Sequence, residues 1–339
     1  MTTVLENASL KNYNTFGIDA KARFLAEVSS ADQLQQYIKD GTFSDQKILV
    51  IGGGSNVLFT KYFDGWVLVN EIKGKGKIAE DENSFLIQVA GGENWSDFVD
   101  YCVERNLYGL ENLSLIPGKV GAAPVQNIGA YGVEQCELMV SLEAINLKTG
   151  EISIFENENC EFGYRSSIFK TKEKGNWFIL NVTYQLKKTP VFNLEYGPLK
   201  AAFEGESPHS ISLKDVSEAV KNIRRSKLPD PAIIGNAGSF FKNPVVSKEK
   251  LENIKSRFPN MAFYEMEDGS VKIPAGWLIE TCGWKGKTLG QAGVHGKQAL
   301  VLVNKGNASG AEILHLSKHI QSDVLKQFNI ELEPEVLIM

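Results

Sequence analysis

The ten-residue segment from Gly235 to Pro244, GNAGSFFKNP, brings together several groups that can do chemistry. The hydroxyl of Ser239 follows small residues that let a ligand approach closely, and it precedes two aromatic rings, an ammonium group and an amide. A nucleophilic serine needs a base and often lies in a G-x-S-x-G turn, whereas this pattern is G-S-F and no histidine is nearby. We therefore interpret Ser239 as a proton donor or a ligand contact. From this segment alone, a glycine-rich turn without a chemical role is an equally good interpretation.

A glycine-rich turn also follows the buried-strand pattern of residues 47–51. Backbone N–H groups in the sequence Gly52-Gly53-Gly54-Ser55-Asn56 can line up on a diphosphate, because no Cβ blocks its approach. A Walker loop needs Gly-Lys-Ser/Thr, which is absent, and a Rossmann fingerprint needs glycine where Val57 stands and then a helix. Residues 57–59 instead look extended. We expect a phosphate-binding turn of another fold.

A second glycine-rich loop runs from Pro117 to Pro124 and continues through residues 126–132. Two such loops in one chain indicate a long cofactor that is bound mainly by backbone amides. A dinucleotide flavin meets that requirement.

Charged residues in two further segments are candidate ligand contacts. Arg165, between Tyr164 and Ser166, is suited to bind a carboxylate through two hydrogen bonds, although a surface ion pair is the alternative. Glu331, Glu333 and Glu335 share one face if the C-terminal segment is a strand. A solvated edge strand explains them too, and Pro334 permits it.

Composition limits the classes of function. The net charge of −5 over 339 residues argues against broad binding to nucleic acid or anionic membranes, but it allows a local basic pocket. The four cysteines form no C-x-x-C pair, so we expect no disulfide framework, no structural zinc and a reducing cytoplasm. His315 and His319 have helical spacing without the H-E-x-x-H pattern. We expect two partly exposed helix histidines and no metal. No signal peptide and no membrane-spanning run is evident.

The remaining pattern alternates short strands with amphipathic helices, which predicts an α+β protein. Serine-initiated capping boxes predict three helix starts, and a loop with two prolines either covers a ligand or lies on the surface with Tyr196 exposed. The helices are expected from Ser29, over 94–106, from Ser212, over 248–258, around Trp277 and from Ser309; the strands over 47–51, 66–69, 85–90, 141–147, 151–155, 177–186, 298–304 and 330–339; and the loop over 190–199.

The order of these motifs resembles one family along nearly the whole chain. The segments that carry the resemblance are residues 14–18, 52–57, 116–132, 163–170, 235–244 and 332–336. Together they resemble the UDP-N-acetylenolpyruvoylglucosamine reductases, the flavoproteins of peptidoglycan precursor synthesis. Residues 196–199, YGPL, resemble the extra loop of the longer sequence type.

The resemblance implies a reduction by NADPH through FAD, in ping-pong order. Hydride goes to the methylene carbon of the enolpyruvyl group, and the neighbouring carbon gains carbanion character that is delocalised into the carboxylate. Arg165 matches the cationic stabiliser, Glu335 matches its acidic partner, and Ser239 matches the proton donor. Preorganised donors around such a charge are an effective form of catalysis, and an enolate is basic enough to take a proton from serine.

The resemblance also implies two sets of binding residues. The nucleotide-sugar substrate is expected at Tyr164, Tyr196, Lys227, Asn243, Tyr264, Lys272 and Gln298. FAD is expected at Gly52, Gly53, Gly54, Ser55, Asn56, Pro117, Gly118, Gly121, Ala122, Asn127, Gly129, Tyr131 and Gly132.

The implied fold is a three-domain α+β flavoprotein of the vanillyl-alcohol-oxidase (PCMH) type. Residues 1–70 with 322–339 form the first FAD-binding domain and 71–211 the second, so that FAD binding extends over about 17–189. Residues 212–321 bind the substrate. We expect a monomer that binds neither nucleic acid nor membrane.

Two departures and two alternatives accompany this resemblance. Leu337 stands where the family commonly has arginine, and Ala122 and Ala123 stand where some members have serines. An FAD oxidase of small alcohols or hydroxy acids is one alternative, and a nucleotide-sugar-binding module without activity is the other.

Overall fold

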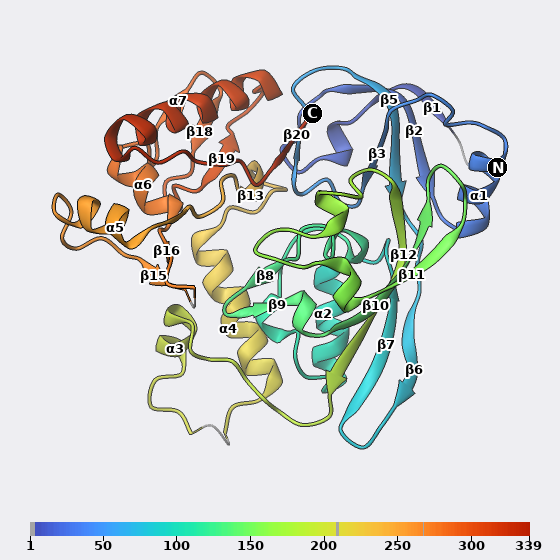
Figure 1. Cartoon of the computed structure of the whole chain (residues 1–339), viewed down its shortest axis with the longest axis horizontal. Coiled ribbons are helices and arrows are strands. Elements are labelled where there is room, and N and C mark those ends of the chain that lie inside the picture. Colours follow the sequence, from blue (N-terminus) through green and yellow to red (C-terminus); the bar gives the residue numbers. More distant parts are fainter. Residues whose placement is uncertain (1–3, 208–209, 267) are drawn as a thin grey trace. The chain divides into compact units, whose positions relative to one another are not determined.

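The structure is a computed structural model that describes residues 4–207, 210–266 and 268–339 (Figure 1). Its described part forms two compact units. The first contains the chain up to Ala8, then Ala22–Gly54 and Asp64–Ser226; the second contains Ser9–Lys21, Ser55–Phe63 and Lys227–Met339. The boundary between the units thus divides the first glycine-rich loop between Gly54 and Ser55.

The first unit begins with a four-stranded sheet in the order β1-β2-β5-β3. Its β3 and β5 are parallel, with Ile48 opposite Trp66. Helix α1 packs on it through Leu34, and Phe43 and Trp66 complete the same core. The elements are β1 (Leu5–Ser9), β2 (Lys21–Val28), α1 (Ala31–Lys39), β3 (Ile48–Ile51) and β5 (Phe63–Asn70).

A five-stranded antiparallel sheet, ordered β11-β10-β12-β7-β6, forms the larger part of this unit. Helix α2 is buried on it through an apolar side that includes Trp95, Phe98 and Val99, as the helical spacing predicts. The elements are β6 (Lys75–Glu80), β7 (Ser84–Ala90), α2 (Trp95–Glu104), β10 (Met139–Asn146), β11 (Ile152–Glu156) and β12 (Trp177–Lys187).

The second glycine-rich loop lies between α2 and β10 and contains short 3-10 turns at Glu111–Leu113 and Val120–Ala122. It also contains a small hairpin of β8 (Gly129–Ala130) and β9 (Val133–Glu134). Helix α4 (Leu213–Lys227) packs against this region, since the hydroxyls of Ser114 and Ser217 are 2.8 Å apart and both side chains are buried. The predicted loop over 190–199 is irregular until α3 (Gly197–Ala202).

The second unit contains a sheet in the order β13-β19-β18-β17, a three-stranded sheet β14-β16-β15 and a parallel pair of β20 with β4. Helices α6 and α7 contribute Leu278 and Ile313 to its core. Its elements are β4 (Val57–Leu58), β13 (Gly235–Ser239), β14 (Val245–Val246), α5 (Lys248–Lys255), β15 (Tyr264–Glu265), β16 (Val271–Lys272), α6 (Ala275–Thr281), β17 (Thr288–Leu289), β18 (Ala292–Val294), β19 (Val301–Asn304), α7 (Gly310–Phe328) and β20 (Leu337–Ile338).

Capping chemistry is confirmed at two of the three predicted helix starts. The side chain and backbone of Ser212 bond reciprocally to Asp215, and Ser309 does so with Glu312. The first helix differs, because Ser30 rather than Ser29 accepts the bond from Gln33 N–H. Ser29 instead donates its backbone N–H to the Gln33 side chain, so the helix begins one residue later than predicted.

The prediction of a strand over 330–339 is wrong for most of that segment. Regular pairing is confined to Leu337–Ile338. The burial alternates as predicted, with Leu332 and Val336 buried and Glu331 and Glu333 exposed. Pro334 has no N–H for a ladder and makes only an isolated bridge with Phe241.

The two units divide the chain differently from the three-domain prediction, which places residues 212–226 in a substrate domain. Contacts place these residues in the first unit. Residues 1–3, 208–209 and 267, which the predicted domains include, lie outside the described residues. The three-domain division, which rests on function rather than on contacts, stays a prediction.

Candidate functional site

The two glycine-rich loops meet within the first unit. A Cβ on Gly53 would lie 3.4 Å from the Gly118 Cα, and one on Gly52 would lie 3.0 Å from the Lys119 Cβ. Further along the second loop, a Cβ on Gly121 would lie 3.1 Å from the Gly91 Cα. The two loops are therefore in backbone contact, and side chains at Gly52 and Gly121 would crowd it. Such a cradle of bare backbone fits the diphosphate and ribose part of a dinucleotide flavin.

Lys119 fastens the second loop to the neighbouring strand end. Its ammonium donates to the Asn70 carbonyl at 2.7 Å and pairs with Glu71. Burial raises the pKa of the Glu71 carboxyl, but Lys119 and Lys73 outweigh this effect, so that its pKa lies below the usual value. Pro117 and Ala122, two of the residues predicted to contact FAD, are exposed at the edge of the cradle.

Arg165 lies against the far part of the same loop. Its guanidinium donates to the Gly129 carbonyl at 2.6 Å and to the Asn127 carbonyl at 3.4 Å, and it lies 5.4 Å from the centre of the Tyr164 ring. Glu134 is 4.0 Å away and accepts a bond from Asn127. The Arg165 backbone is left-handed, with φ of 53°, which is unusual for a side chain of this size. Four predicted site residues, namely Asn127, Gly129, Tyr164 and Arg165, are thus brought together.

The second unit brings Glu335 beside the Ser239 segment. Glu335 N–H donates to the Phe240 carbonyl at 2.8 Å, and Lys242 N–H donates to the Glu333 carbonyl at 2.9 Å. The Glu335 carbonyl accepts a bond of 3.3 Å from the side chain of Asn56. Ser239 is partly exposed, and its hydroxyl makes no hydrogen bond within the described residues. Ser239, Glu335 and Asn56 therefore belong to one backbone-stabilised cluster.

Several residues predicted to bind substrate gather at the start of α6. The Asn243 side chain accepts the Ala275 N–H at 2.9 Å, and a Cβ on Gly276 would lie 2.9 Å from the Gln298 side-chain oxygen. Lys272 ends β16 three residues before α6, and Tyr264 is its partner on β15. Asn243 and Gln298 thus have structural contacts that the sequence does not reveal.

Tyr196 contacts the second glycine-rich loop within the first unit. Its ring is 41% exposed and lies edge-to-face on Tyr131 at 5.3 Å. Arg224 of α4 donates to the Leu115 carbonyl at 3.1 Å and to the Tyr131 hydroxyl. Burial lowers the pKa of Arg224 and raises that of Tyr131, and their hydrogen bond opposes both shifts.

Arg224 was missed as a site residue by the sequence reasoning. The helix dipole accounts for a basic last turn, so its position alone gave no reason to single it out. Asn112 and Asn193, which bond to the same loop, were missed as well. Neither has a local signal in the sequence, because Asn112 lies 19 residues from Tyr131 and Asn193 lies 61 residues from Gly132.

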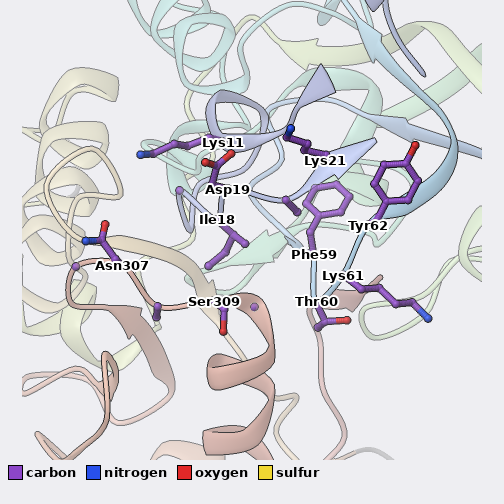
Figure 2. A pocket seen from close by; sticks show the side chains of 15 residues that line it. Lys11, Ile18, Asp19, Lys21, Phe59, Thr60, Lys61, Tyr62, Asn307 and Ser309 are labelled. Atoms are coloured by element: carbon purple, nitrogen blue, oxygen red, sulfur yellow. The ribbon is translucent and has the colours of Figure 1, made fainter. Parts of the chain in front are cut away.

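A cavity of 560 Å³ in the second unit contains none of the predicted site residues. It lies at the start of α7 and has Lys11, Lys21 and Lys61 at its edge. Figure 2 shows Lys11 and Lys61 pointing in opposite directions, so their charges do not converge on one anion.

Metal-binding and membrane-spanning features are not found within the described residues. There, no group of three or more His, Cys, Asp or Glu residues is arranged to bind a metal, and no helix is long and apolar enough to cross a membrane. His315 and His319 lie exposed on α7 with their Nε2 atoms 3.0 Å apart.

Comparison with known proteins gives a consistent result. Residues 22–155 match the FAD binding domain, and residues 230–339 match the C-terminal domain of UDP-N-acetylenolpyruvoylglucosamine reductase. The chain is 49% identical to the UDP-N-acetylenolpyruvoylglucosamine reductase of Flavobacterium johnsoniae over 99% of both chains, and 48% identical to that of Amoebophilus asiaticus over 98% of both. A crystal structure of the enzyme from Thermus caldophilus matches the fold with a TM-score of 0.68 at 21% identity, covering 100% of this chain and 98% of that one.

The fold and the glycine cradle define an α+β flavoprotein that binds FAD, which confirms the fold class and cofactor predicted from the sequence. The near full-length identity is more specific. The chain belongs to the UDP-N-acetylenolpyruvoylglucosamine reductase family.

Proposed function

We propose that this protein reduces the enolpyruvyl ether of UDP-N-acetylglucosamine to the lactyl ether, UDP-N-acetylmuramate, in peptidoglycan precursor synthesis. NADPH is the electron donor and FAD the carrier. The observation that carries this proposal is identity of 49% with a reductase of that name over 99% of both chains. The contact of the two glycine-rich loops at Gly53 and Gly118 supports it, because it brings two stretches of bare backbone together for one long cofactor.

The cofactor is proposed to lie along the two glycine-rich loops. When bound, FAD supplies reversible hydride chemistry. Residues 52–54 and 117–122 approach the diphosphate through backbone, while Asn127, Gly129, Tyr131 and Gly132 continue the surface toward Arg165. The positions that carry serines in some relatives, Ala122 and Ala123, offer no hydroxyl here, so backbone or water makes those contacts.

Arg165 is proposed to receive the negative charge that develops on the substrate. Addition of hydride to the methylene carbon leaves an electron pair on the neighbouring carbon, delocalised into the carboxylate as an enolate. Two donors of the guanidinium are already fixed on loop carbonyls, so its plane is oriented before the substrate arrives. Preorganised charge of this kind lowers a barrier without reorganisation during the reaction.

Ser239 is proposed to donate the proton that completes the reaction. Its O–H bond breaks as a C–H bond forms at the carbon next to the carboxylate, which discharges the enolate. The hydroxyl has no competing hydrogen bond among the described residues. Glu335 is proposed as the acidic partner, and its backbone bond to Phe240 supports a position beside the serine.

The nucleotide part of the substrate is proposed to contact Tyr164, Tyr196, Lys227, Asn243, Tyr264, Lys272 and Gln298. The convergence of Asn243, Lys272 and Gln298 at the start of α6 supports this set. The lysines provide positive charge for the diphosphate in a chain whose net charge is −5. We also propose a cytoplasmic protein that binds neither nucleic acid nor membrane. We propose that it is a monomer, and sedimentation at micromolar concentration tests this oligomeric state.

The proposal is tested by visible absorption of the purified protein. We expect a yellow protein whose flavin is bleached by NADPH and recovers its absorbance on addition of UDP-N-acetylenolpyruvoylglucosamine without oxygen. Bleaching by a small alcohol or hydroxy acid would favour an oxidase instead. A colourless protein that binds the UDP-sugar would favour a binding module.

A further inference from the structure

Two asparagines join the second glycine-rich loop to the segment that bears Tyr196. The side-chain amide of Asn112 donates one hydrogen bond to the Tyr131 carbonyl and another to the Asn193 carbonyl, each at 2.8 Å. The side-chain amide of Asn193 in turn donates to the Gly132 carbonyl at 2.8 Å. We name these three hydrogen bonds the Asn112–Asn193 clamp. Both sides of the clamp lie within the first unit.

The local geometry shows how closely the two segments fit. Gly132 has a φ of 84°, and a Cβ there would lie 3.1 Å from the Asn193 amide nitrogen, so a side chain at this position would strain the backbone and crowd the clamp. Tyr131 also has a left-handed backbone, with φ of 52°. Two of the three carbonyls that accept the clamp bonds, those of Tyr131 and Gly132, therefore belong to residues with a left-handed backbone. The clamp stabilises that conformation.

Asn112 is 1% exposed, and both of its donors bond to backbone carbonyls. Its side-chain oxygen has no hydrogen-bond partner within the described residues. A buried amide with an unpaired acceptor is a poor choice for core stability alone, because an apolar side chain would fill the space without an unpaired group. The two carbonyls are the physical reason for an asparagine at this place.

Beyond the clamp the chain turns outward. Just before the clamp, Phe192 packs near Tyr108, with 6.0 Å between the ring centres. Just after it, Glu195 and Tyr196 are exposed. The ring of Tyr196 lies edge-to-face on that of Tyr131, the residue whose carbonyl Asn112 binds. Tyr196 therefore extends from a base that is fixed on the loop predicted to contact FAD. The three clamp bonds hold the chain on the N-terminal side of Tyr196, and on the other side its carbonyl accepts the Leu199 and Lys200 N–H groups of α3.

We propose that Asn112 and Asn193 are positioning residues of the reductase, which act by placing Tyr196 over the nucleotide-sugar substrate. The inference rests on the proposed function, because Tyr196 is a substrate contact only in that reaction. The inference goes beyond that function in one respect: the loop predicted to contact FAD and the segment that bears Tyr196 are held together by the clamp. Loss of the clamp weakens substrate binding while the chemical step persists.

The experiment is a double-mutant cycle on the holoenzyme with Asn193→Ala and Tyr196→Ala. The assay is steady-state kinetics with NADPH and UDP-N-acetylenolpyruvoylglucosamine. Asn193→Ala should raise KM about three- to tenfold, which corresponds to the free energy of about one net hydrogen bond. Its kcat should change less than twofold. In the Tyr196→Ala background the same substitution should change KM less than twofold, because the residue it positions is already gone.

Asn157→Ala is the matched control. Asn157 also donates two side-chain hydrogen bonds to backbone carbonyls, those of Cys136 at 2.7 Å and Met139 at 2.8 Å, but it has no contact with the clamp. It should leave KM within twofold of the wild type. If Asn193→Ala does not retain FAD, Asn193→Ser, which keeps a shorter donor, replaces it in the cycle.

Each result separates the clamp from the wider proposal. An Asn193→Ala variant with the KM of the Asn157→Ala control, or an equal rise in KM with and without Tyr196, would overturn the clamp while wild-type turnover stands. A wild-type protein that does not turn over the UDP-sugar would instead overturn the proposed function, and the clamp with it.

Discussion

The second glycine-rich loop and the Ser239 segment differ in the bonds that surround their predicted functional groups. In the loop, side chains bind backbone: Asn112, Arg165 and Lys119 each donate to carbonyls of the loop or its neighbours. In the Ser239 segment, backbone binds backbone, through the bonds that join residues 240–242 to 333–335. The Ser239 hydroxyl remains without a bond within the described residues.

This difference indicates that the loop and the Ser239 segment have different roles. A loop whose carbonyls are bound by surrounding side chains can present a rigid backbone surface to a cofactor. In the Ser239 segment, Asn236, Lys242 and Asn243 also make side-chain bonds, but the Ser239 hydroxyl stays available for a substrate that enters and leaves. Substitutions in the two regions should therefore affect different steps.

The largest effect is expected in the Ser239 segment. Ser239→Ala should lower kcat by about 10²- to 10⁴-fold, since the enolate loses its proton donor, and it should leave FAD content unchanged. Turnover assays with matched flavin absorbance measure this. Ser247→Ala is the control, because Ser247 caps α5 by accepting the Lys250 N–H; it should lower stability by about 1 kcal/mol without lowering kcat.

Arg165 binds a carbonyl of the loop and is also the proposed cation for the enolate, so its substitution tests both roles. Arg165→Met should reduce kcat by about 10²- to 10³-fold, since the charge on the enolate then loses its stabilising cation. The exposed Arg225, whose guanidinium lies 3.4 Å from the Asn222 side-chain oxygen and 3.9 Å from the Glu218 carboxylate, provides the control Arg225→Met. A variant that loses FAD but keeps turnover once FAD is restored would place Arg165 in the architecture alone.

A smaller effect is expected in the cofactor cradle. Gly121→Ala puts a Cβ 3.1 Å from the Gly91 Cα and carbonyl oxygen, so the backbones must separate. Overpacking of this kind costs about 1–3 kcal/mol, and FAD affinity should fall about tenfold, as equilibrium dialysis of the apoprotein would show. Gly76→Ala, on a strand with nothing within 4 Å of the new Cβ, should bind FAD like the wild type.

The smallest effect concerns the ion pair that fastens the cradle. The lowered pKa of Glu71 means that its charged form stabilises the fold above the ordinary value of 4.5, and that this contribution is lost as pH falls through the lower folded-state pKa. Because the side chain is partly exposed, solvent screens the pair and its value is at most about 1 kcal/mol. Urea unfolding of Glu71→Gln should therefore show a deficit at pH 7 that shrinks below pH ~4.5. The exposed Glu82→Gln should show no deficit at either pH; a constant deficit for Glu71→Gln would contradict the ion-pair account.

The elements with strong periodicity were predictable from the sequence. Trp95, Phe98 and Val99 define α2, and the reciprocal Ser309–Glu312 cap defines the start of α7, because these signals are local. The two glycine-rich loops predicted one long cofactor, whereas their contact at Gly53 and Gly118 depends on the fold.

Features that depend on distant partners were not predictable. The C-terminal segment looks like one long strand, yet its backbone bonds go in turn to Lys242, Phe240 and Asn56, which no local pattern encodes. The role of Asn112 cannot be predicted from the sequence either, because its two hydrogen-bond partners, the carbonyls of residues 131 and 193, lie near it only in the folded chain. The catalytic roles of Arg165, Ser239 and Glu335 came from family resemblance and stay predictions.

The central claim, that protonation and flavin reduction depend on different regions, is tested most directly by separating the two half-reactions of Ser239→Ala. Anaerobic stopped-flow absorbance should show the flavin reduced by NADPH at nearly the wild-type rate, and reoxidised by UDP-N-acetylenolpyruvoylglucosamine at least 100-fold more slowly. An equal loss in both half-reactions, or an undiminished rate of reoxidation, would contradict the account.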